Sequence, residues 1–451
     1  MRVALITPRG AMFGKGAPLA AFLQETGAME TFRRLWTGPN LGLITIAAML
    51  PAGCDAVYID ENYSPVDLDA AYDLVCLSAM TQQAPRAYEI ADRFRARGVR
   101  TVMGGIHATV EPEEAASHAD TVVVGEAEGL FAEFLADFLA GRPRRFYRHQ
   151  ATGSVDLTTS PTPRYDLLPV DLYPLITIQT TRGCPHDCSF CAASKVYGPR
   201  YRVKTVDQVL AEVQALSRVR PNPFILFADD NMFVMRRFSR ELLERLAPLR
   251  LRWIGQTDIS IAKDPDFLDL MVRAGCQWVV IGFESVTAAG LEALDRDNWK
   301  LRQLSDYPRA IATIQDHGVG VYGTFIVGLD ADDASVFQRT ADFIAENNLY
   351  GFNVTVPTPL PGTALRSRLL ADGRVTGSDW SNYTLWDVNI RPRGMSAGAL
   401  EEGLLQIYRG LYTPEHVQRR LRHFLHVVAR RPAVSGGRVP GGEKSGGGKA
   451  P

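Results

Sequence analysis

Three cysteines crowd into eight residues of this chain, at Cys184, Cys188 and Cys191. Thiolates are soft ligands that bind zinc or iron–sulfur clusters, and offsets of four and three residues let all three converge on one small inorganic body. A structural zinc ion would need a fourth protein ligand, for which His186 is the local candidate. An iron–sulfur cluster held by three cysteines would instead leave one iron open to a substrate or cofactor.

The composition is that of an ordinary globular protein. The 451 residues predict two or three domains, 46 % are hydrophobic and 22 % are charged. Lys and Arg number 49 against 50 Asp and Glu, a net charge of -1, so no overall basic excess predicts a nucleic-acid partner. Six cysteines do not make a disulfide framework in so long a chain, and they indicate a reducing, cytoplasmic setting. We expect no signal peptide and no membrane span, and we expect Cys54, Cys76 and Cys276 to be buried small hydrophobic residues.

The elements that must position the cysteines begin with a predicted N-terminal domain, residues 1–140. Short β-branched runs alternate there with amphipathic stretches, the pattern of a parallel sheet covered by helices. Five such units predict a doubly wound, flavodoxin-like α/β domain, in which ligands bind beyond the carboxyl ends of the strands. The expected strands are 2–7, 55–60, 73–79, 100–105 and 121–126, and the clearest helices are 85–97 and 130–139.

A second alternating series follows a predicted linker, residues 141–172. Six βα units over 173–375 are too few for a closed eight-stranded barrel, so they predict a partial (β/α)6 barrel. Residues 376–430 are expected to form a helical segment, and 431–451 a disordered tail, because 10 of those 21 residues are Gly or Pro. The expected strands are 175–181, 224–230, 252–259, 278–285, 319–329 and 351–358, and the expected helices are 206–218, 238–248, 265–274, 301–317, 334–347 and 399–430.

The cysteine spacing carries a resemblance. Cys-x3-Cys-x2-Cys directly after the first strand of a (β/α)6 barrel, with the aromatic Phe190 before the third cysteine, resembles the radical S-adenosylmethionine (SAM) superfamily. The resemblance implies a 4Fe-4S cluster on the three cysteines, SAM bound to the open iron, and an electron donor such as flavodoxin or ferredoxin. It also implies a set of SAM-binding residues at the strand ends, although an Asp in such a place is as often a helix N-cap. That set is Asp229, Asp230, Gln256, Asp258, Ser260, Glu284 and Gly328.

The N-terminal domain resembles the cobalamin-binding domain of the cobalamin-dependent radical SAM enzymes. Glycines would let a flat corrin ring approach the backbone, and hydroxyls would bind its nucleotide tail. One departure is that the Asp-x-His-x-x-Gly loop, which ligates cobalt in the mutases, is absent. His107 remains as a possible cobalt ligand or as a hydrogen-bonding residue of its loop. The cobalamin-binding residues expected from the resemblance are Ser78, Thr81, Gly104, Gly105, His107, Gly125 and Glu126.

These resemblances together imply a cobalamin-dependent radical SAM methyltransferase that acts on an unactivated carbon of a small molecule. Two alternatives stay open: a radical oxidative cyclase of the kind that acts on tetrapyrroles, and a non-catalytic cobalamin or redox-sensing module. No RNA-binding module is recognisable. A basic helical face at Arg419, Arg420 and Arg422 is expected to be solvated surface.

Overall fold

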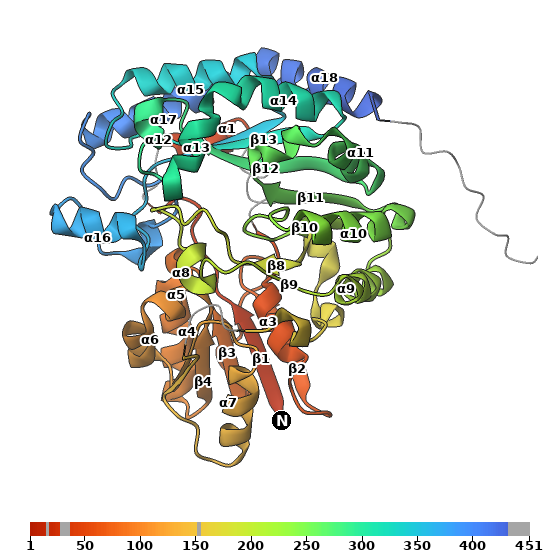
Figure 1. Cartoon of the computed structure of the whole chain (residues 1–451). Helices are drawn as coiled ribbons and strands as arrows, with labels where there is room; N and C mark the ends of the chain where they lie inside the picture. Colours follow the sequence, from red (N-terminus) through yellow and green to blue (C-terminus); the bar gives the residue numbers. More distant parts are fainter. Residues whose placement is uncertain (15–17, 28–36, 151–154, 432–451) are drawn as a thin grey trace, which may run out of the picture.

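The computed structural model describes residues 1–14, 18–27, 37–150 and 155–431, and its N-terminal part is built on a six-stranded sheet (Figure 1). The strand order is β2-β1-β3-β4-β5-β6 and every pair is parallel. The chain moves outward from β1 in one direction and then in the other, which is the predicted flavodoxin-like order with one extra strand. The strands are β1 (Arg2–Thr7), β2 (Asp55–Asp60), β3 (Leu74–Ser78), β4 (Arg100–Gly104), β5 (Thr121–Val124) and β6 (Phe146–Arg148).

Helices cover both faces of this sheet, because its central strands are apolar on both sides. In β1, Val3 and Leu5 belong to one core and Ala4 and Ile6 to the other. The first core includes the buried sides of α3 (Leu41–Ala47) and α7 (Leu130–Leu139). The second core includes those of α4 (Ala84–Ala96) and α6 (Pro112–His118), and α5 (Gly105–Val110) follows β4 directly.

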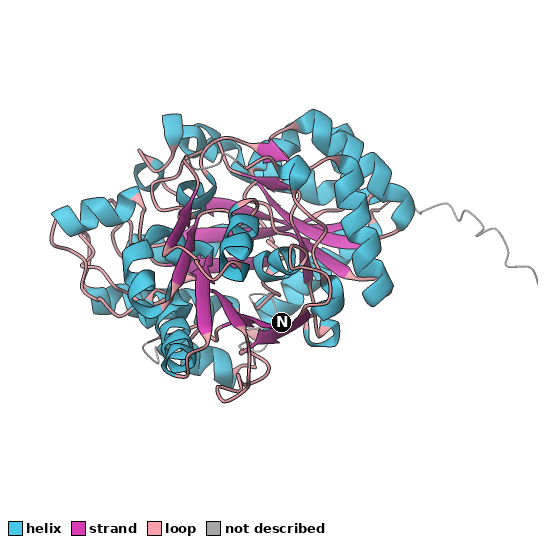
Figure 2. Ribbon diagram, turned by 90° about the horizontal axis from the view of Figure 1, so that it is seen from below, coloured by secondary structure: helices cyan, strands magenta, loops and turns pink. Residues whose placement is uncertain are grey.

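The second sheet is the predicted partial barrel. Its order is β14-β13-β12-β11-β10-β7 and all pairs are parallel, so the carboxyl ends of six strands meet at one rim. The strands are β7 (Ile176–Ile178), β10 (Phe224–Phe227), β11 (Arg252–Thr257), β12 (Cys276–Glu284), β13 (Gly320–Ile326) and β14 (Gly351–Thr355). The main outer helices are α9 (Val206–Val219), α10 (Arg236–Leu246), α11 (Pro265–Arg273), α14 (Tyr307–Asp316) and α15 (Ser335–Glu346). Figure 2 shows strands in the interior of the molecule and helices around them.

Shorter elements lie between the main barrel units. Antiparallel β8 (Thr181–Arg182) and β9 (Arg202–Val203) flank the loop that carries the cysteines and α8 (Ala193–Tyr197). The others are α12 (Ala288–Leu291), α13 (Trp299–Gln303) and α16 (Ala364–Ala371). The helix expected at 301–317 is therefore interrupted: α13 ends at Gln303, and α14 begins at Tyr307 with Pro308 in its first turn.

The C-terminal segment packs on the rest of the molecule at two places. The expected helix at 399–430 is two helices, α17 (Ala397–Leu411) and α18 (Pro414–Ala429), divided where Pro414 begins the second. α17 packs against α15 and against α1 (Pro18–Glu25), the first helix of the chain. α18 lies across the base of the barrel, where Phe424 packs on Tyr350 at a ring distance of 4.0 Å. No helix of the described residues is long and apolar enough to cross a membrane.

Two stretches depart from their description as linker and tail. Residues 146–148 form β6, which pairs with β5 and completes the first sheet, and short 3-10 turns at Leu157–Thr159, Tyr165–Leu167 and Val170–Leu172 lead into the barrel. Arg431 still packs on the barrel, where it donates to Gly318 O at 3.0 Å, and the rest of the predicted tail lies outside the described residues.

Candidate active site

The loop that holds the three cysteines is anchored first by the carboxyl end of β10. Asp229 is buried there and accepts hydrogen bonds from Thr180 N and Thr181 N, both at 2.7 Å, and from Thr180 Oγ1 at 2.6 Å. Its neighbour Asp230 accepts from Gly183 N at 3.1 Å. These bonds fix the backbone just before Cys184. Both aspartates therefore anchor the loop of residues 183–192 that carries the three cysteines, called the cluster loop below.

Gly183 itself has no room for a side chain. Its φ is +89°, and a Cβ there would lie 2.3 Å from Arg200 O, so only glycine fits the turn into the first cysteine. Two further anchors hold the middle of the loop: Ser189 N donates to Leu294 O, and Leu365 N donates to Ser189 O, both at 2.9 Å. Segments that follow four different barrel strands thus hold a loop that has little secondary structure of its own.

His186, the local zinc-ligand candidate, is turned toward the end of β11. Its Nε2 lies 3.2 Å from Asp258 Oδ2, and its ring packs on Trp299 at 4.4 Å. Asp258 also accepts from Asn231 Nδ2 at 2.7 Å and caps Ser260 N at 2.9 Å. Burial alone would raise the pKa of Asp258, but these hydrogen bonds hold it well below its usual range. Asp258 therefore binds both Ser260 N and His186 of the cluster loop.

Burial sets the state of the cysteines. It raises the pKa of Cys184 to about 11 and raises those of Cys188 and Cys191 as well. Metal ligation requires the thiolate, so a bound cluster must supply the positive charge that removes these protons. Within the described ranges no three His, Cys, Asp or Glu side chains are grouped to hold a single metal ion. Three half-buried thiols on one anchored loop are the donor set of a 4Fe-4S cluster with an open iron.

One buried cation stands next to the cysteines. Lys300 Nζ lies 3.1 Å from Glu284 Oε1 and also donates to Gly282 O. Burial opposes the charge of Lys300, but Glu284 keeps its pKa above the usual value, and the ammonium in turn offsets part of the rise that burial causes in the pKa of Cys188. Glu284 has a φ of +63° at the end of β12, a strained conformation for a residue with a side chain. The glutamate expected to bind SAM thus holds Lys300 beside the cluster loop.

The two remaining residues expected to bind SAM, Gln256 and Gly328, lie in different surroundings. Gln256 is exposed in the carboxyl-terminal half of β11. Gly328 has a φ of +92°, and a Cβ there would lie 2.6 Å from Leu400, so packing against α17 explains its identity. Phe190 packs on the main hydrophobic core as a partly buried residue.

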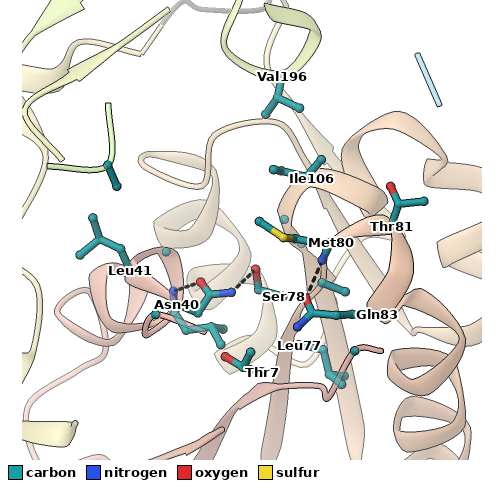
Figure 3. A pocket seen from close by; sticks show the side chains of 18 of the residues that line it. Thr7, Asn40, Leu41, Leu77, Ser78, Met80, Thr81, Gln83, Ile106 and Val196 are labelled. Carbon is teal, nitrogen blue, oxygen red and sulfur yellow. Dashed lines mark hydrogen bonds between the residues drawn. The ribbon is translucent and has the colours of Figure 1, made fainter. Parts of the chain in front are cut away.

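A cavity of about 620 Å³ lies between the two domains, bordered by the carboxyl ends of β1, β3, β4 and β5 on one side and of β7 and β10 on the other. The three cysteines are not among its lining residues. Ser78, Thr81, Gly104, Gly105 and Gly125 all line it, as the resemblance implied. Figure 3 shows Ser78 and Thr81 on this wall and Val196, from α8 of the barrel, on the opposite side. Residues from both halves of the chain therefore share one chamber.

Asn40 and Gln83 are among the lining residues that were missed from sequence. Asn40, the N-cap of α3, donates from Nδ2 to Ser78 Oγ at 3.1 Å and accepts from Leu43 N. Gln83 accepts from Met80 N at 2.9 Å and donates to Pro8 O, which ties the loop after β3 to the loop after β1 (Figure 3). An Asn before an apolar helical run is an N-cap signal that would have located α3, but nothing local indicates its contact with Ser78.

His107 does not line the cavity, so its expectation as a cofactor residue needs correction. Its side chain is buried on the far side of α5, with Nε2 2.9 Å from Tyr88 Oη and its ring 5.3 Å from that of Trp380. Burial lowers the ring's pKa to about 4, and Nδ1 has no hydrogen-bond partner among the described residues. The reason is geometric: Gly105 turns the chain at a φ of +88°, which sends His107 toward α4.

Glu126 lines the cavity but is held in a buried ion network that joins the two domains. Arg182, two residues before Cys184, lies 2.8 Å from Glu126 and 2.6 Å from Glu128. Arg202 binds the other side of Glu126 at 2.8 Å. All four side chains are at most 12 % exposed. Burial alone would raise the pKa of Glu128, but the charge of Arg182 lowers it to about 2. The loop after β5 is thereby clamped to the strand that leads into the cysteines.

The last wall of the cavity comes from the two ends of the chain. Tyr383, Thr384, Leu385 and Trp386 line it beside Met12. The ring of Phe13 packs on Trp386 at 5.3 Å, and Gly14 N donates to Asp387 Oδ2 at 2.7 Å. These contacts join residues more than 370 positions apart, which sequence patterns do not reveal.

Two family models match the chain, the B12 binding domain over residues 34–135 and the Radical SAM superfamily over residues 178–344. The chain thus combines a B12 binding domain with a radical SAM domain. It is similar to bacteriochlorophyllide d C-12(1)-methyltransferase of Chlorobaculum tepidum, with 29 % identity over 392 residues that cover 85 % of this chain and 84 % of the relative. It is also 25 % identical over 418 residues to the anaerobic magnesium-protoporphyrin IX monomethyl ester cyclase of Rubrivivax gelatinosus, covering 83 % and 74 % of the two chains.

A solved structure shares the fold of this chain. The radical SAM methyltransferase TsrM of Kitasatospora setae, with cobalamin and a 4Fe-4S cluster bound, superposes with a TM-score of 0.67 at 15 % identity and covers 93 % of this chain and 90 % of that one. That structure holds cobalamin and a 4Fe-4S cluster. In this chain the three thiols on the anchored loop could hold such a cluster, and the cavity lined by the B12 binding domain could hold cobalamin.

Proposed function

We propose that this protein is a cobalamin-dependent radical SAM methyltransferase that adds a methyl group to an unactivated carbon of a small molecule. The observation that carries the proposal is the chamber of about 620 Å³ on which the strand ends of both domains converge. A methyl carrier and a radical source must face the same substrate atom, and a chamber shared by both cofactor domains holds them in that geometry.

The residues of this chain supply binding, orientation and exclusion of water. When bound, the cluster and SAM supply a one-electron cleavage that yields the 5'-deoxyadenosyl radical, and cobalamin carries the methyl group. Cys184, Cys188 and Cys191 would hold the cluster, and Asp229 and Asp258 hold the loop that presents them. Ser78 and Asn40 offer a fixed polar contact on the cobalamin side. A low-potential donor such as flavodoxin or ferredoxin, in the reducing cytoplasm, belongs to the same proposal.

The cobalamin wall supplies a matched pair of variants. A Cβ on Gly104 would have its nearest neighbour at 3.7 Å, and the backbone there is extended, so Gly104→Ala should fold normally and intrude only on the chamber. A Cβ on Gly105 would lie 2.6 Å from Ser78 Oγ at a φ of +88°, so Gly105→Ala should destabilise the domain itself. Anaerobic cobalamin titration should show weaker binding for Gly104→Ala at unchanged melting temperature.

The decisive test is anaerobic reconstitution of the full chain, followed by metal analysis and product mass. We expect about four irons per chain together with cobalt, and a product heavier than the substrate by one methylene. Cys188→Ala should lose the iron, whereas Cys54→Ser, half-buried in the other domain, should keep it. Zinc without iron would refute the assignment. Cobalt without iron would favour the non-catalytic module.

An oxidative cyclase is the second candidate, because one relative at 25 % identity carries that activity. Both activities need the same cluster loop, so the cysteine variants do not separate them. The product does: a cyclase leaves the carbon count of its substrate unchanged, and a methyltransferase incorporates the labelled methyl group of SAM.

A further inference from the structure

The base of the barrel, where its strands begin, exposes several large apolar side chains. Ten large apolar side chains are exposed among the described residues, and four of them lie at this end. Val417, Leu421 and Leu425 form a stripe on α18 at intervals of four residues, with exposures of 39 %, 52 % and 59 %. Leu249 precedes β11 and is 42 % exposed. The inner side of α18 is already used, because Phe424 and Val427 pack on the protein.

The same end is rich in arginine. Exposed arginines stand where barrel strands begin: Arg218 before β10, Arg250 and Arg252 at the start of β11, and Arg273 before β12. Arg422 continues the series on α18, beside the apolar stripe. In the part of the chain that the structure describes, none of the five forms an ion pair.

Few carboxylates offset these arginines. Asp316 is paired with Arg430, and Asp269 with His317. Exposed acids at this end include Glu244, Glu346 and Glu415. The base thus carries an excess of positive charge on a chain whose net charge is -1.

We propose that the base of the barrel binds the surface of an anionic lipid bilayer. Aliphatic side chains bordered by arginines on an exposed helix are the composition of an interfacial helix, in which the apolar stripe enters the headgroup region and the cations meet lipid phosphates. A second copy of the chain fits less well, because a two-fold contact along α18 would bring Arg422 near its own counterpart. Nucleic acid fits less well too, since its binding sites commonly add aromatic side chains for base stacking.

The position of the surface is compatible with catalysis. α18 lies at the top of Figure 1 and the N-terminal domain at the bottom, so the two do not share a face. The chamber is bordered by the carboxyl ends of the strands, so a bilayer on the base leaves it uncovered. The inference is independent of the methyl transfer proposed above.

Vesicle sedimentation of the full chain tests the proposal. The protein should sediment with vesicles of phosphatidylcholine and phosphatidylglycerol, should not sediment with phosphatidylcholine alone, and should be released by high salt. Leu421→Ser/Leu425→Ser should weaken binding about tenfold, since both side chains are already half exposed, and Arg250→Glu/Arg252→Glu should abolish the preference for anionic lipid. Leu139→Ser/Leu370→Ser is the matched control, because these leucines are 61 % and 52 % exposed on α7 and α16.

Several results would overturn the inference. Binding by the α18 double variant equal to that of the unchanged protein would do so, provided that the melting temperatures agree. A dimer in light scattering that dissociates in the Leu421→Ser/Leu425→Ser variant would assign the stripe to a second copy. Tighter binding to single-stranded RNA than to anionic vesicles would assign the arginines to nucleic acid.

Discussion

Arg182→Met tests the ion network that joins the two domains. The substitution keeps much of the apolar stem but removes a guanidinium that lies 2.8 Å from Glu126 and 2.6 Å from Glu128. Glu128 is 8 % exposed and would remain buried without its main partner. Removal of one member of a buried ion pair typically destabilises a protein by about 3–5 kcal/mol, because it leaves an uncompensated charge.

A second route gives a similar magnitude. The pKa of Glu128 is about 2 in the folded chain, against a reference value of 4.5. A carboxyl group with a lowered pKa stabilises the fold above its unfolded pKa, and this contribution disappears as the pH falls from about 4.5 to about 2. The difference corresponds to about 3 kcal/mol at neutral pH. At roughly 2–4 °C per kcal/mol, Arg182→Met should lower the melting temperature by about 6–12 °C.

The assay is thermal unfolding of the apo chain, with two controls. Arg240→Met removes a pair with Asp264 that is 38 % and 27 % exposed, and exposed pairs contribute less than about 1 kcal/mol. Arg182→Met/Glu128→Gln removes both members while Glu126 keeps Arg202, so it should recover about half of the loss. Equal melting temperatures for Arg182→Met and Arg240→Met would refute the reasoning, as would a double variant that is no better than Arg182→Met alone.

Three further predictions concern single residues. His107→Gln should leave cobalt content unchanged and reduce acid sensitivity in thermal melts: with a folded pKa of about 4, the ring destabilises the native chain as the pH falls below about 6.5, by roughly 2 kcal/mol at pH 5. Loss of cobalt in this variant would contradict the placement of the ring. Asp229→Asn should keep iron after reconstitution, because burial already raises the pKa of Asp229 to about 6 and an amide still accepts from Thr180 N and Thr181 N. Asp229→Ala should lose iron and about 1–3 kcal/mol of stability, and normal loading of the alanine variant would argue against the anchor. Gly328→Ala should destabilise by about 2–4 kcal/mol, since strain and a contact with Leu400 add, whereas Gly125→Ala has the strain alone and should lose about 1–2 kcal/mol in chemical unfolding. Equal losses would rule out the steric contribution.

The fold followed from local patterns wherever those patterns were long enough. β1 has the expected bounds because an apolar run is cut off by Pro8, and α7 begins and ends as its periodicity predicts. β6 was missed because three residues, Phe146–Arg148, show no period. The break near Gln303 was missed because the apolar periodicity continues across it.

The site divides in the same way. The cysteines stand out because their spacing is itself a signal, and the residues predicted on the cobalamin side line the cavity, His107 excepted, because they follow strands. The ligand-binding roles expected of Asp258, Glu284 and Glu126 stay predictions, and the structure gives each side chain a protein partner that sequence position does not reveal. Glu126 and Arg202 are 76 positions apart, and the charge of each gave no indication of the other.

The contacts of residues 13–14 with residues 386–387 limit how the protein can be divided. α1 belongs to the first domain by sequence but packs on α17, and Trp380, far along the chain, donates to Glu114 Oε1 at 2.8 Å. A cut between the domains would leave each fragment with apolar surface that belongs against the other. The two halves should therefore require co-expression to form the chamber. An insertion among residues 10–14 should disturb the contacts with residues 380–387 and should be tolerated less well than a fusion partner at a terminus.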